Sequence, residues 1–560
     1  MKSKHNETSQ RDETSGNLQS EAPPIDNVPI RRVLVSVFDK TGIDQLAVGL
    51  KAAGVRVAST GGTATALAKH GLDVEDVSQI TGFPEVLDGR VKTLHPNIFA
   101  GILAREDHPS DLKILSQHGI ERFDAVIVNL YDFESVMKRP DCEHAEAIEL
   151  IDIGGPSLVR AAAKNHAFTA VITHPSQYVD FLQAVGNGGI SLASRRELAA
   201  QAFDHTAKYD SMIATWMSRY VSQLGSEELM EEKELSKSTL ATELTLQLDQ
   251  RSPLRYGENP HQDAALYAPA GTRSGVAGLR QLCGKELSYN NLLDLDAAVR
   301  LVSLLKEPSA AVIKHTNPCG AASGTSIKQA LSSAMAADPT SAFGSIVAVN
   351  HEFDEAAAEV LLTPGLFVEV IAAPSFEASA VQLLTTRPSW RASVRLVEIP
   401  SGDPWVVTDG LEFRSVAGGF LAQKIDDQVD SDEDWKVATK KPPSGDLLAS
   451  LKFAFTIVRR LTSNAICVCQ GTNLVGAGVG QTSRVDSVRI ALEKAGSRAE
   501  GSVLASDAFF PFPDSIELMR DAGIQAIVQP GGSKRDSEVI AAADEAGIPM
   551  MLTSIRHFRH

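Results

Sequence analysis

The sequence predicts an α/β protein with two successive α/β regions. From Arg31 onward, short apolar runs alternate with segments of helical spacing, which is typical of a parallel, doubly wound sheet. The alternation resumes near residue 251, after an acidic stretch at 225–238 that lacks a clear apolar face. Ligands of doubly wound sheets collect beyond the carboxyl ends of the strands. The residues that follow each strand are therefore the candidates for a site.

Length and charge limit the classes of function. The chain has 560 residues and a formal net charge of −17, which argues against a dedicated nucleic-acid binder but leaves room for small anionic substrates. No apolar run approaches the ~18 residues of a membrane span. The five cysteines are odd in number and sparse, so no disulfide framework is expected and a reducing compartment, the cytosol, is favoured.

The expected organisation has four parts. Residues 1–28 are polar, carry both charge signs and lack the apolar stretch of a secretory signal, so a disordered tail is predicted. A first domain is expected over 29–225, a linker over 226–250 and a second region over 251–560. No internal repeat is visible in the sequence.

The elements of the first region follow in order. Strands are expected in "RRVLVSVF", "VRVAS", "FDAVIVNLYDF" and "FTAVITHPSQY", with helices in "IDQLAVGLKAAG" and "ATALAKHG" and over 178–222. The turn "STGGT" feeds the second helix with Thr60, Gly61, Gly62 and Thr63. Free N–H groups and the positive dipole end at such a turn favour an anion, although a capped helix with a tight turn has the same letters.

Polar side chains also follow the other strands of the first region. They are Ser36 and Lys40 in "SVFDKTG", Arg90, Lys92 and Thr93 in "GRVKTLHP", Asn129 and Tyr131 in "NLYDF", and Asp152 and Lys164 in "IDIGGPSLVRAAAKNH". Arg and Lys on alternate positions fit a phosphate, although a solvated basic loop has the same composition. Several such features in the loops of one sheet favour a ligand pocket.

In the second region, the segment "VIKHTNPCG" at 312–320 is predicted to be a buried strand that ends at Lys314 and His315, followed by a Pro-Cys-Gly turn. The helix in "NNLLDLDAAVRLV" is expected to have Asn291 as its N-cap and Asp294 in its first turn. Further upstream, "RYGENPHQ" offers Arg255 and Tyr256 for a phosphate and a ring, although a simple turn explains it equally well.

A zinc deaminase would carry the motif H-x-E, followed later in the sequence by P-C-x-x-C. "HAE" occurs at 144–146 and "PCGA" at 318–321, but Ala322 stands where the second cysteine is needed. Cys467 and Cys469 have the wrong spacing, and the two pieces fall in different predicted domains. No catalytic metal is therefore expected.

The motifs of the first half resemble a known family. "SVFDKTG", "STGGT", "TGFPEVLDGRVKTLHP", "NLYDF" and "IDIGGPSLVRAAAKNH" are similar to the N-terminal domain of the phosphoribosylaminoimidazolecarboxamide (AICAR) formyltransferase/IMP cyclohydrolase family. The resemblance implies a methylglyoxal-synthase-like, doubly wound fold for 29–225 and closure of formyl-AICAR to IMP with loss of water. One departure is Asp132, where many relatives have proline.

The resemblance also implies roles for residues of the first half. Asp152 and Lys164 would handle the carboxamide proton, and Lys92 and Tyr131 would orient and polarise the formyl group. Backbone N–H groups of Ile153 and Gly154 would hold the oxyanion. The remaining residues would bind the nucleotide: Ser36, Lys40, Thr60, Gly61, Gly62, Thr63, Arg90, Thr93 and Asn129.

The motifs of 251–560 resemble the transformylase part of the same family. They are "RYGENPHQ", "KHTNPCGAA", "SNAICV", "GAGVGQTSRVDSVRIA", "SDAFFPFPDSIE" and the terminal "RHFRH". The resemblance implies two cytidine-deaminase-like subdomains that transfer a formyl group from 10-formyltetrahydrofolate to the amine of AICAR. It also implies a homodimer whose transferase site spans the interface, with neither nucleic acid nor membrane as a partner.

Lys314 and His315 fit that chemistry. The amine is a poor nucleophile and needs a base near neutral pH, which suits His315. Lys314 would stabilise the tetrahedral oxyanion or protonate the folate leaving group, and which residue carries the decisive proton stays open. The resemblance assigns binding roles to Arg255, Tyr256, Gly344, Glu369, Asn464, Arg484, Phe509, Asp514 and His560.

Three alternatives have sequence features against them. A methylglyoxal-synthase-like regulatory module on an unrelated enzyme would not need Lys92, Asp152 and Lys164 together. A zinc nucleoside deaminase lacks its cysteine at Ala322. A protein that has kept only one of the two activities is disfavoured, because every catalytic residue implied by the resemblance is present in this sequence.

Overall fold

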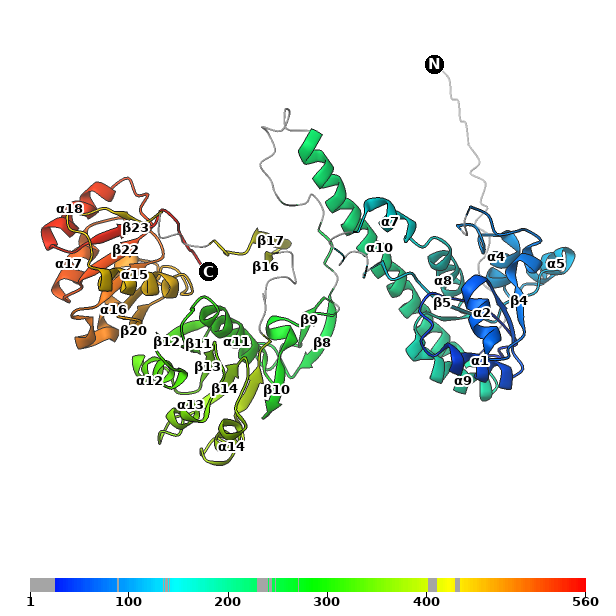
Figure 1. The fold of residues 1–560 in the computed structure, drawn as a ribbon, viewed down its shortest axis with the longest axis horizontal. Helices are drawn as coiled ribbons and strands as arrows, with labels where there is room; N and C mark the ends of the chain where they lie inside the picture. Colours follow the sequence, from blue (N-terminus) through cyan, green and yellow to red (C-terminus); the bar gives the residue numbers. More distant parts are fainter. Residues whose placement is uncertain are drawn as a thin grey trace, which may run out of the picture. The chain divides into compact units, whose positions relative to one another are not determined.

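The computed structural model describes residues 26–87, 90–133, 135, 139, 142–228, 240, 244–246, 248–269, 271–400, 410–428 and 434–560. The chain divides into two compact units, Met1–Thr245 and Leu246–His560 (Figure 1). Most of the predicted tail and of the predicted linker lies outside the described residues. In the part of the chain that is described, no helix is both long enough and apolar enough to span a membrane.

The first unit is built on a five-stranded sheet in the order β4-β3-β2-β5-β6. Every neighbouring pair is parallel, as the alternation of strands and helices predicted. The strands are β2 (Arg32–Val37), β3 (Arg56–Ser59), β4 (Val74–Asp76), β5 (Ala125–Asn129) and β6 (Ala170–Ile172). A separate ribbon pairs β1 (Asn27–Val28) with β7 (Ile190–Ser191).

Helices cover both faces of this sheet. One apolar cluster includes Leu34, Ile98 and Leu158, and the other includes Val33, Leu46 and Phe181. The helices are α1 (Ile43–Ala52), α2 (Gly61–Lys69), α3 (Val77–Thr81), α4 (Pro96–Leu103), α5 (Pro109–His118), α7 (His144–Glu149), α8 (Gly154–Lys164), α9 (Tyr178–Gly186) and α10 (Leu192–Glu228). This arrangement is a doubly wound α/β layer structure.

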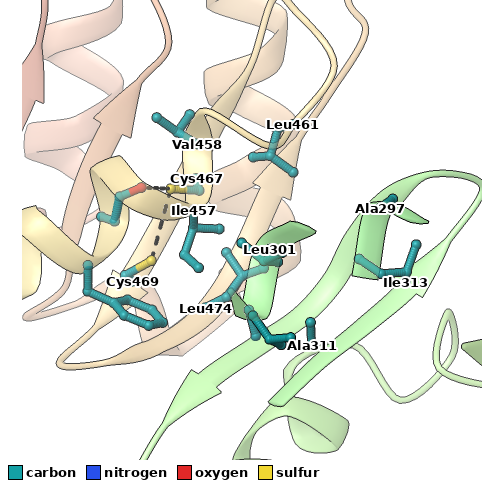
Figure 2. Packing of buried hydrophobic residues seen from close by; sticks show 14 of the residues in the cluster. Ala297, Leu301, Ala311, Ile313, Ile457, Val458, Leu461, Cys467, Cys469 and Leu474 are labelled. Atoms are coloured by element: carbon teal, nitrogen blue, oxygen red, sulfur yellow. Dashed lines mark hydrogen bonds between the residues drawn. The ribbon is translucent and has the colours of Figure 1, made fainter. Parts of the chain in front are cut away.

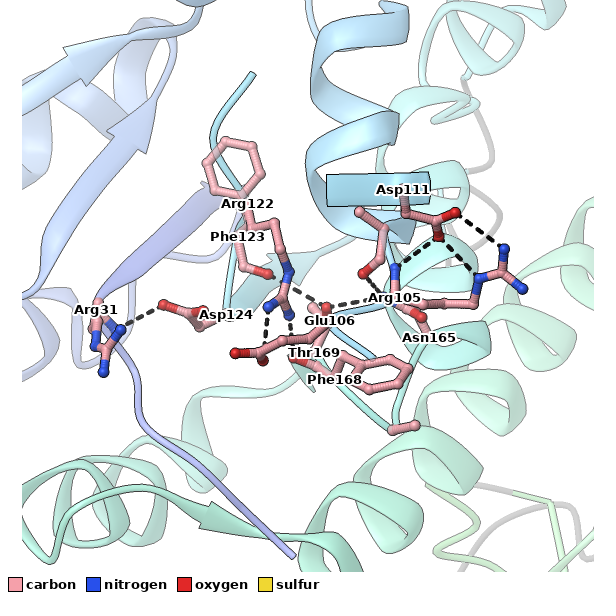
Figure 3. Close-up of polar contacts among 12 residues, drawn as sticks. Arg31, Arg105, Glu106, Asp111, Arg122, Phe123, Asp124, Asn165, Phe168 and Thr169 are labelled. Atoms are coloured by element: carbon pink, nitrogen blue, oxygen red, sulfur yellow. Dashed lines mark hydrogen bonds and ion pairs between the residues drawn. The ribbon is translucent and has the colours of Figure 1, made fainter. Parts of the chain in front are cut away.

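A polar network closes the amino end of the sheet (Figure 3). The Asp124 carboxylate accepts from the backbone N–H of Arg31 at 2.8 Å and of Arg32 at 2.9 Å. Arg122 pairs with Glu106 at 2.7 Å and donates to the carbonyl oxygen of Phe168 at 3.2 Å. Because this network lies at the amino ends of β2, β5 and β6, the carboxyl edge of the sheet is left for a site.

The second unit contains a twelve-stranded sheet in the order β10-β15-β14-β13-β11-β12-β20-β19-β21-β22-β23-β18. Its strands are β10 (Arg280–Cys283), β11 (Ser309–Lys314), β12 (Asn317–Ser323), β13 (Ser345–Val349), β14 (Val368–Ala373), β15 (Arg395–Glu398), β18 (Lys436–Val437), β19 (Ile466–Gln470), β20 (Asn473–Gly478), β21 (Val503–Ser506), β22 (Ala526–Gln529) and β23 (Met550–Leu552). Two hairpins lie outside it: β8 (Asp249–Leu254) with β9 (Ala264–Ala268), and β16 (Leu411–Val416) with β17 (Gly419–Lys424).

The large sheet repeats one plan twice, although the sequence shows no repeat. In each half, a helix precedes a β-hairpin. Three mutually parallel strands follow the hairpin, and a helix precedes each of them. Helices α11 (Tyr289–Val302), α12 (Ile327–Ala337), α13 (Glu355–Val360) and α14 (Ala378–Thr386) belong to the first half. Helices α15 (Gly445–Val458), α16 (Arg484–Ala495), α17 (Asp514–Asp521) and α18 (Asp536–Ala546) belong to the second. Strands β12 and β20 join the halves through Ala322 and Asn473.

The two halves share one apolar core (Figure 2). Leu301 on α11 and Ile313 on β11 belong to the same buried cluster as Ile457 on α15 and Leu474 on β20. Cys467 is fully buried there, and its thiol donates to the carbonyl oxygen of Ala454 at 3.1 Å. This continuous core fixes α11 against β11, which matters for the turn that follows β11.

Candidate active sites

A cavity of about 570 Å³ opens at the carboxyl edge of the first sheet. It gathers nearly all of the site residues that the sequence predicts for this unit. They are Ser36, Lys40, Thr60, Gly61, Gly62, Thr63, Arg90, Lys92, Thr93, Asn129, Tyr131, Asp152, Ile153 and Gly154. The carboxyl ends of parallel strands meet at one edge, which explains why residues so far apart in sequence line one cavity.

Lys164 is the predicted member that this cavity lacks. It is exposed and ends the helix that Gly154 begins, which puts it about 15 Å further along the axis. Within one chain the structure does not bring Lys164 to Asp152, because a full helix length separates them. The predicted shared proton transfer has no geometric support in the cavity, and the catalytic role of Lys164 stays a prediction.

Two predicted ligand residues shape the cavity rather than offer free polar atoms. Asn129 accepts from the backbone N–H of Phe38 at 2.6 Å and of Asp39 at 2.9 Å, and donates to the Asp39 carbonyl oxygen at 2.8 Å. The Thr63 hydroxyl donates to the carbonyl oxygen of Val37 at 2.9 Å. Both side chains therefore fix the loop after β2. Phe38, which the sequence interpretation missed, lies edge-to-face with Tyr131 at 5.3 Å.

Two helix N-termini, those of α2 and α8, line the cavity. The positive end of each helix dipole makes the cavity favourable for negative charge. At α8, the Asp152 carboxylate accepts from the backbone N–H of Gly155 at 2.8 Å. A Cβ on Gly155 would lie 2.3 Å from Asp152 Oδ2 and 2.7 Å from Leu130 Cδ2, so only glycine fits there.

Asp152 has an environment suited to a proton acceptor. Burial raises the pKa of its carboxyl, and backbone N–H groups of Gly155 and Gly154 oppose that rise by stabilising the carboxylate. The Tyr209 hydroxyl lies 2.8 Å from the Asp152 backbone N–H and donates to the Leu150 carbonyl oxygen at 3.2 Å. The raised pKa makes Asp152 a stronger base than an exposed aspartate.

Two basic side chains of the cavity, Arg90 and Lys92, are paired with glutamates. Arg90 binds Glu149 through two N–H groups, with its Nε 3.2 Å from Oε2. Lys92 Nζ lies 2.9 Å from Glu85 Oε1. The sequence interpretation missed both glutamates. Glu149 stands three positions before Asp152 in "AIELIDIGG", so its position near the site could have been predicted from the local sequence. Nothing in the sequence around Glu85 indicates that it lies near the site.

In the second unit, Lys314 and His315 line a cavity of about 280 Å³. Its other walls come from β12, the end of α12, β20 and α16. They include Asn317, Cys319, Asp338, Ser341, Gly476, Gln481 and Lys494. Lys494 Nζ lies 2.8 Å from Asp338, which in turn accepts from the Ser341 hydroxyl at 2.7 Å.

The predicted Pro-Cys-Gly turn is wrong. Pro318, Cys319 and Gly320 lie in β12, which pairs antiparallel with β11 so that Lys314 faces Asn317. The turn is the two-residue loop His315–Thr316, with φ of 51° and 61°. Positive φ at both central residues is the signature of a tight hairpin turn whose twist matches the strands. The missing N–H of Pro318 is accommodated at a bulge in the ladder.

The helix that faces this turn also begins differently from the prediction. Ser288, not Asn291, is the N-cap of α11, and Asn291 completes a capping box by accepting from the Ser288 backbone N–H at 3.1 Å. Asp294 therefore lies in the second turn of the helix rather than in the first. Its carboxylate accepts from the backbone N–H of Thr316 at 2.6 Å and of His315 at 3.3 Å.

Lys314 is held by the loop before β13. Its ammonium donates to the carbonyl oxygens of Phe343 at 3.0 Å and Gly344 at 2.9 Å. Gly344 has a φ of 68°, and a Cβ there would lie 3.1 Å from Lys314 Nζ. The structure thus places Gly344 beside the ammonium, and the nucleotide contact that the resemblance implied for Gly344 stays a prediction.

Asn464 and Arg484, both predicted to bind substrate, lie together in a buried network. Arg484 is 7% exposed and pairs with the fully buried Asp507. It also donates to Asn464 Oδ1 at 2.7 Å, and Asn464 Nδ2 donates to the carbonyl oxygen of Gln481 at 2.9 Å. Because Gln481 lines the cavity, this buried network helps to fix one wall of the cavity.

The other residues predicted for this site do not line the cavity. Arg255 and Tyr256 stack on each other beside β8, with the guanidinium 4.7 Å from the ring centroid. Glu369 pairs with Arg395 at 3.5 Å. Phe509 and His560 are exposed, and Asp514 opens α17. The cavity of one unit therefore contains only part of the predicted set.

Cys319 faces the cavity as a thiol. Its Sγ donates to the carbonyl oxygen of Val312 at 3.3 Å, and burial raises its pKa to about 12. A thiol that stays protonated at neutral pH is a poor nucleophile, so Cys319 shapes the wall rather than reacting.

Comparisons with known proteins show the family of this chain. Residues 162–494 match the family model of the AICARFT/IMPCHase bienzyme, and residues 42–157 match that of the MGS-like domain. The chain belongs to the AICARFT/IMPCHase bienzyme family. It is a bifunctional enzyme with AICAR formyltransferase and IMP cyclohydrolase activities, which confirms the predicted family, fold class and pair of reactions. The first activity requires a folate formyl donor.

Curated relatives extend over almost the whole chain. A bifunctional purine biosynthesis protein PurH from Rhodopirellula baltica is 51% identical over 537 residues, which cover 96% of this chain and 100% of the relative. A protein of the same name from Mesorhizobium japonicum is 46% identical over 553 residues, covering 96% and 98% of the two chains. The crystal structure of ForH is 37% identical, with a TM-score of 0.31, and covers 33% of this chain and 97% of its own.

Proposed function

We propose that the cavity of the first unit closes formyl-AICAR to IMP, and that Lys314 and His315 of the second unit transfer the formyl group to AICAR. One observation carries the proposal for the first unit: every site residue predicted there except Lys164 lines one cavity with Asp152. In the second unit, Lys314 and His315 line a cavity of their own. Each reaction therefore has its own unit and its own set of side chains.

For ring closure, the carboxamide nitrogen attacks the formyl carbon, and the formyl oxygen leaves as water. The raised pKa of Asp152 suits it to accept the carboxamide proton. Lys92 and Tyr131 polarise the formyl oxygen, and the backbone N–H groups of Ile153 and Gly154 stabilise the developing oxyanion at the start of α8. The N–H of Gly154 serves the oxyanion once Asp152 has taken the carboxamide proton and no longer needs that donor for its charge. The nucleotide phosphate binds at the start of α2.

For formyl transfer, the AICAR amine attacks the formyl carbon while His315 takes its proton. The Lys314 ammonium has three N–H donors, and two of them go to the carbonyl oxygens of Phe343 and Gly344. The third is available for the tetrahedral oxyanion or for the folate nitrogen that leaves. The two carbonyl groups orient that donor before substrate arrives.

The donor is proposed to be 10-formyltetrahydrofolate, with no catalytic metal. A homodimer is proposed with the transferase site across its interface, since Arg255 and Tyr256 lie outside the cavity of their own unit. A reducing compartment, the cytosol, is proposed because Cys142, Cys283, Cys319, Cys467 and Cys469 are all free.

The division of labour is tested with His315→Ala. The variant should lose IMP formation from AICAR and 10-formyltetrahydrofolate but keep IMP formation from formyl-AICAR. His351→Ala is the matched control, because His351 is an exposed histidine of the same unit that lies outside the cavity, with its ring 2.9 Å from Asn350 Oδ1. Loss of both activities in His315→Ala, or of neither, would contradict the proposal.

A further inference from the structure

The turn that carries His315 is strained and lacks the residues that normally relieve such strain. His315 and Thr316 both have positive φ, a region that glycine and asparagine enter readily. Thr316 is β-branched, and its side chain makes this conformation especially unfavourable. Something outside the turn must hold it in place, because strained backbone persists only where its surroundings over-determine it.

One carboxylate meets both N–H groups of the turn. Asp294 Oδ1 accepts from the Thr316 N–H at 2.6 Å, and Oδ2 accepts from the His315 N–H at 3.3 Å. Such hydrogen bonds to a charged acceptor are stronger than neutral ones. They also fix the orientation of two consecutive peptide planes, which is what a turn with two positive φ values requires.

The carboxylate is itself rigidly mounted. Helix α11 is fixed at its start by the Ser288 capping box and along its length by buried Leu295, Ala298 and Leu301. Figure 2 shows Leu301 of this helix close to Ala311 of β11, within the shared core. The helix that presents Asp294 and the strand that leads to His315 therefore form one packed unit.

The carbonyl side of the turn has partners too. Arg559 donates to the Thr316 carbonyl oxygen at 2.9 Å, and Asn317 Nδ2 donates to that of His315 at 3.1 Å. Asn317 Oδ1 in turn accepts from the Thr462 N–H at 2.9 Å. These contacts involve the second half of the large sheet, but each binds only one carbonyl group of the turn. Asp294 is the group that spans both peptide N–H groups.

We propose that Asp294 is a positioning residue for formyl transfer: it holds the His315–Thr316 turn in its strained form and so keeps the His315 imidazole aimed at the reacting amine beside Lys314. This proposal rests on the assignment of His315 to the transferase reaction. Without Asp294 the turn relaxes toward negative φ, and the direction of the His315 side chain changes with it.

The test compares Asp294→Ala with the double variant Asp294→Ala/Thr316→Gly in the full-length protein. Asp294→Ala should lower the transferase kcat between about tenfold and 100-fold, with a much smaller change in KM for AICAR, because a misaimed base impairs the chemical step. Glycine at 316 accepts positive φ without strain, so the double variant should recover most of the lost kcat. IMP formation from formyl-AICAR should stay unchanged in both.

Asp354→Ala is the matched control for stability. Asp354 is also a carboxylate that accepts a backbone N–H, that of Ala357 at 2.7 Å, but it caps α13 away from the turn. It should lower the melting temperature without changing the transferase kcat. Equal loss of kcat in Asp294→Ala and Asp354→Ala, or no recovery with glycine at 316, would overturn the proposal.

A readout independent of activity separates this proposal from the assignment of His315. Amide hydrogen exchange of the peptide that contains His315 and Thr316 should be faster in Asp294→Ala, and in the milder Asp294→Asn, than in Asp354→Ala. Unchanged exchange would overturn the positioning role. Full transferase activity in His315→Ala, with faster exchange in Asp294→Ala, would instead contradict the proposed function alone.

Discussion

The two proposed active sites reach their geometry in different ways. In the first unit, Arg90 and Lys92 extend from an exposed loop and bind the glutamates Glu149 and Glu85. In the second unit, Lys314 is held by two backbone carbonyl groups and His315 by a strained turn. The basic groups of the first site are thus paired with internal carboxylates, whereas those of the second are held by the backbone.

The difference follows from what each reaction requires. The cyclohydrolase substrate carries both reacting groups, so the cavity must mainly bind the phosphate and fold one molecule. The transferase must align two substrates, and a base or donor that moves would lose much of the advantage of proximity. A rigid mount for the two catalytic side chains is therefore most valuable in the second unit.

The largest expected effect comes from removing the ammonium at the second site. Lys314→Met should lower formyl transfer by about 10²- to 10³-fold, because the oxyanion loses its preorganised donor. Ring closure of formyl-AICAR should not change. Steady-state assays of the two reactions check this, with Lys328→Met as control, since Lys328 is an exposed lysine of the same unit that pairs with Glu359. A similar loss in the control would show a general effect on the unit.

A smaller effect is expected from crowding Asp152 in the first unit. In Gly155→Ala, the new Cβ would push against Asp152 and Leu130, so the cyclohydrolase kcat should fall between about tenfold and 100-fold. Formyl transfer should be unaffected. Gly186→Ala is the control, because a Cβ at this helical glycine meets nothing within 4 Å. Normal ring closure in Gly155→Ala would mean that the position of Asp152 is not critical.

The smallest effect is expected at the glutamate that competes for Arg90. Glu149→Gln should lower KM for formyl-AICAR by about two- to fivefold, because an exposed ion pair contributes little and its loss frees the guanidinium. Glu146→Gln is the control, since Glu146 lies on the same helix and pairs with Arg139 instead. A raised KM in Glu149→Gln would show that Glu149 helps to bind the substrate rather than competing with it.

The lining of the first cavity could be predicted almost completely from sequence, and that of the second only in part. Thr60 and Asp152 follow strands of a parallel sheet, so local pattern and topology together place them at one edge. The turn at His315 and Thr316 contains no glycine, asparagine or aspartate, the residues from which such a turn is usually predicted. Pro318 lies in the strand that follows, and a proline argues against a strand when only the sequence is read. Its stabilising group, Asp294, comes from a helix earlier in the chain, and only tertiary packing reveals that contact.

The central claim, that each unit performs its own reaction with its own residues, is tested most directly by mixing two inactive variants. Asp152→Asn should convert AICAR and 10-formyltetrahydrofolate to formyl-AICAR without forming IMP, and His315→Ala should form no product from them. Mixed together, the two variants should form IMP after a lag in which formyl-AICAR accumulates. A mixture that still forms no IMP, or Asp152→Asn alone forming IMP at the normal rate, would contradict the account.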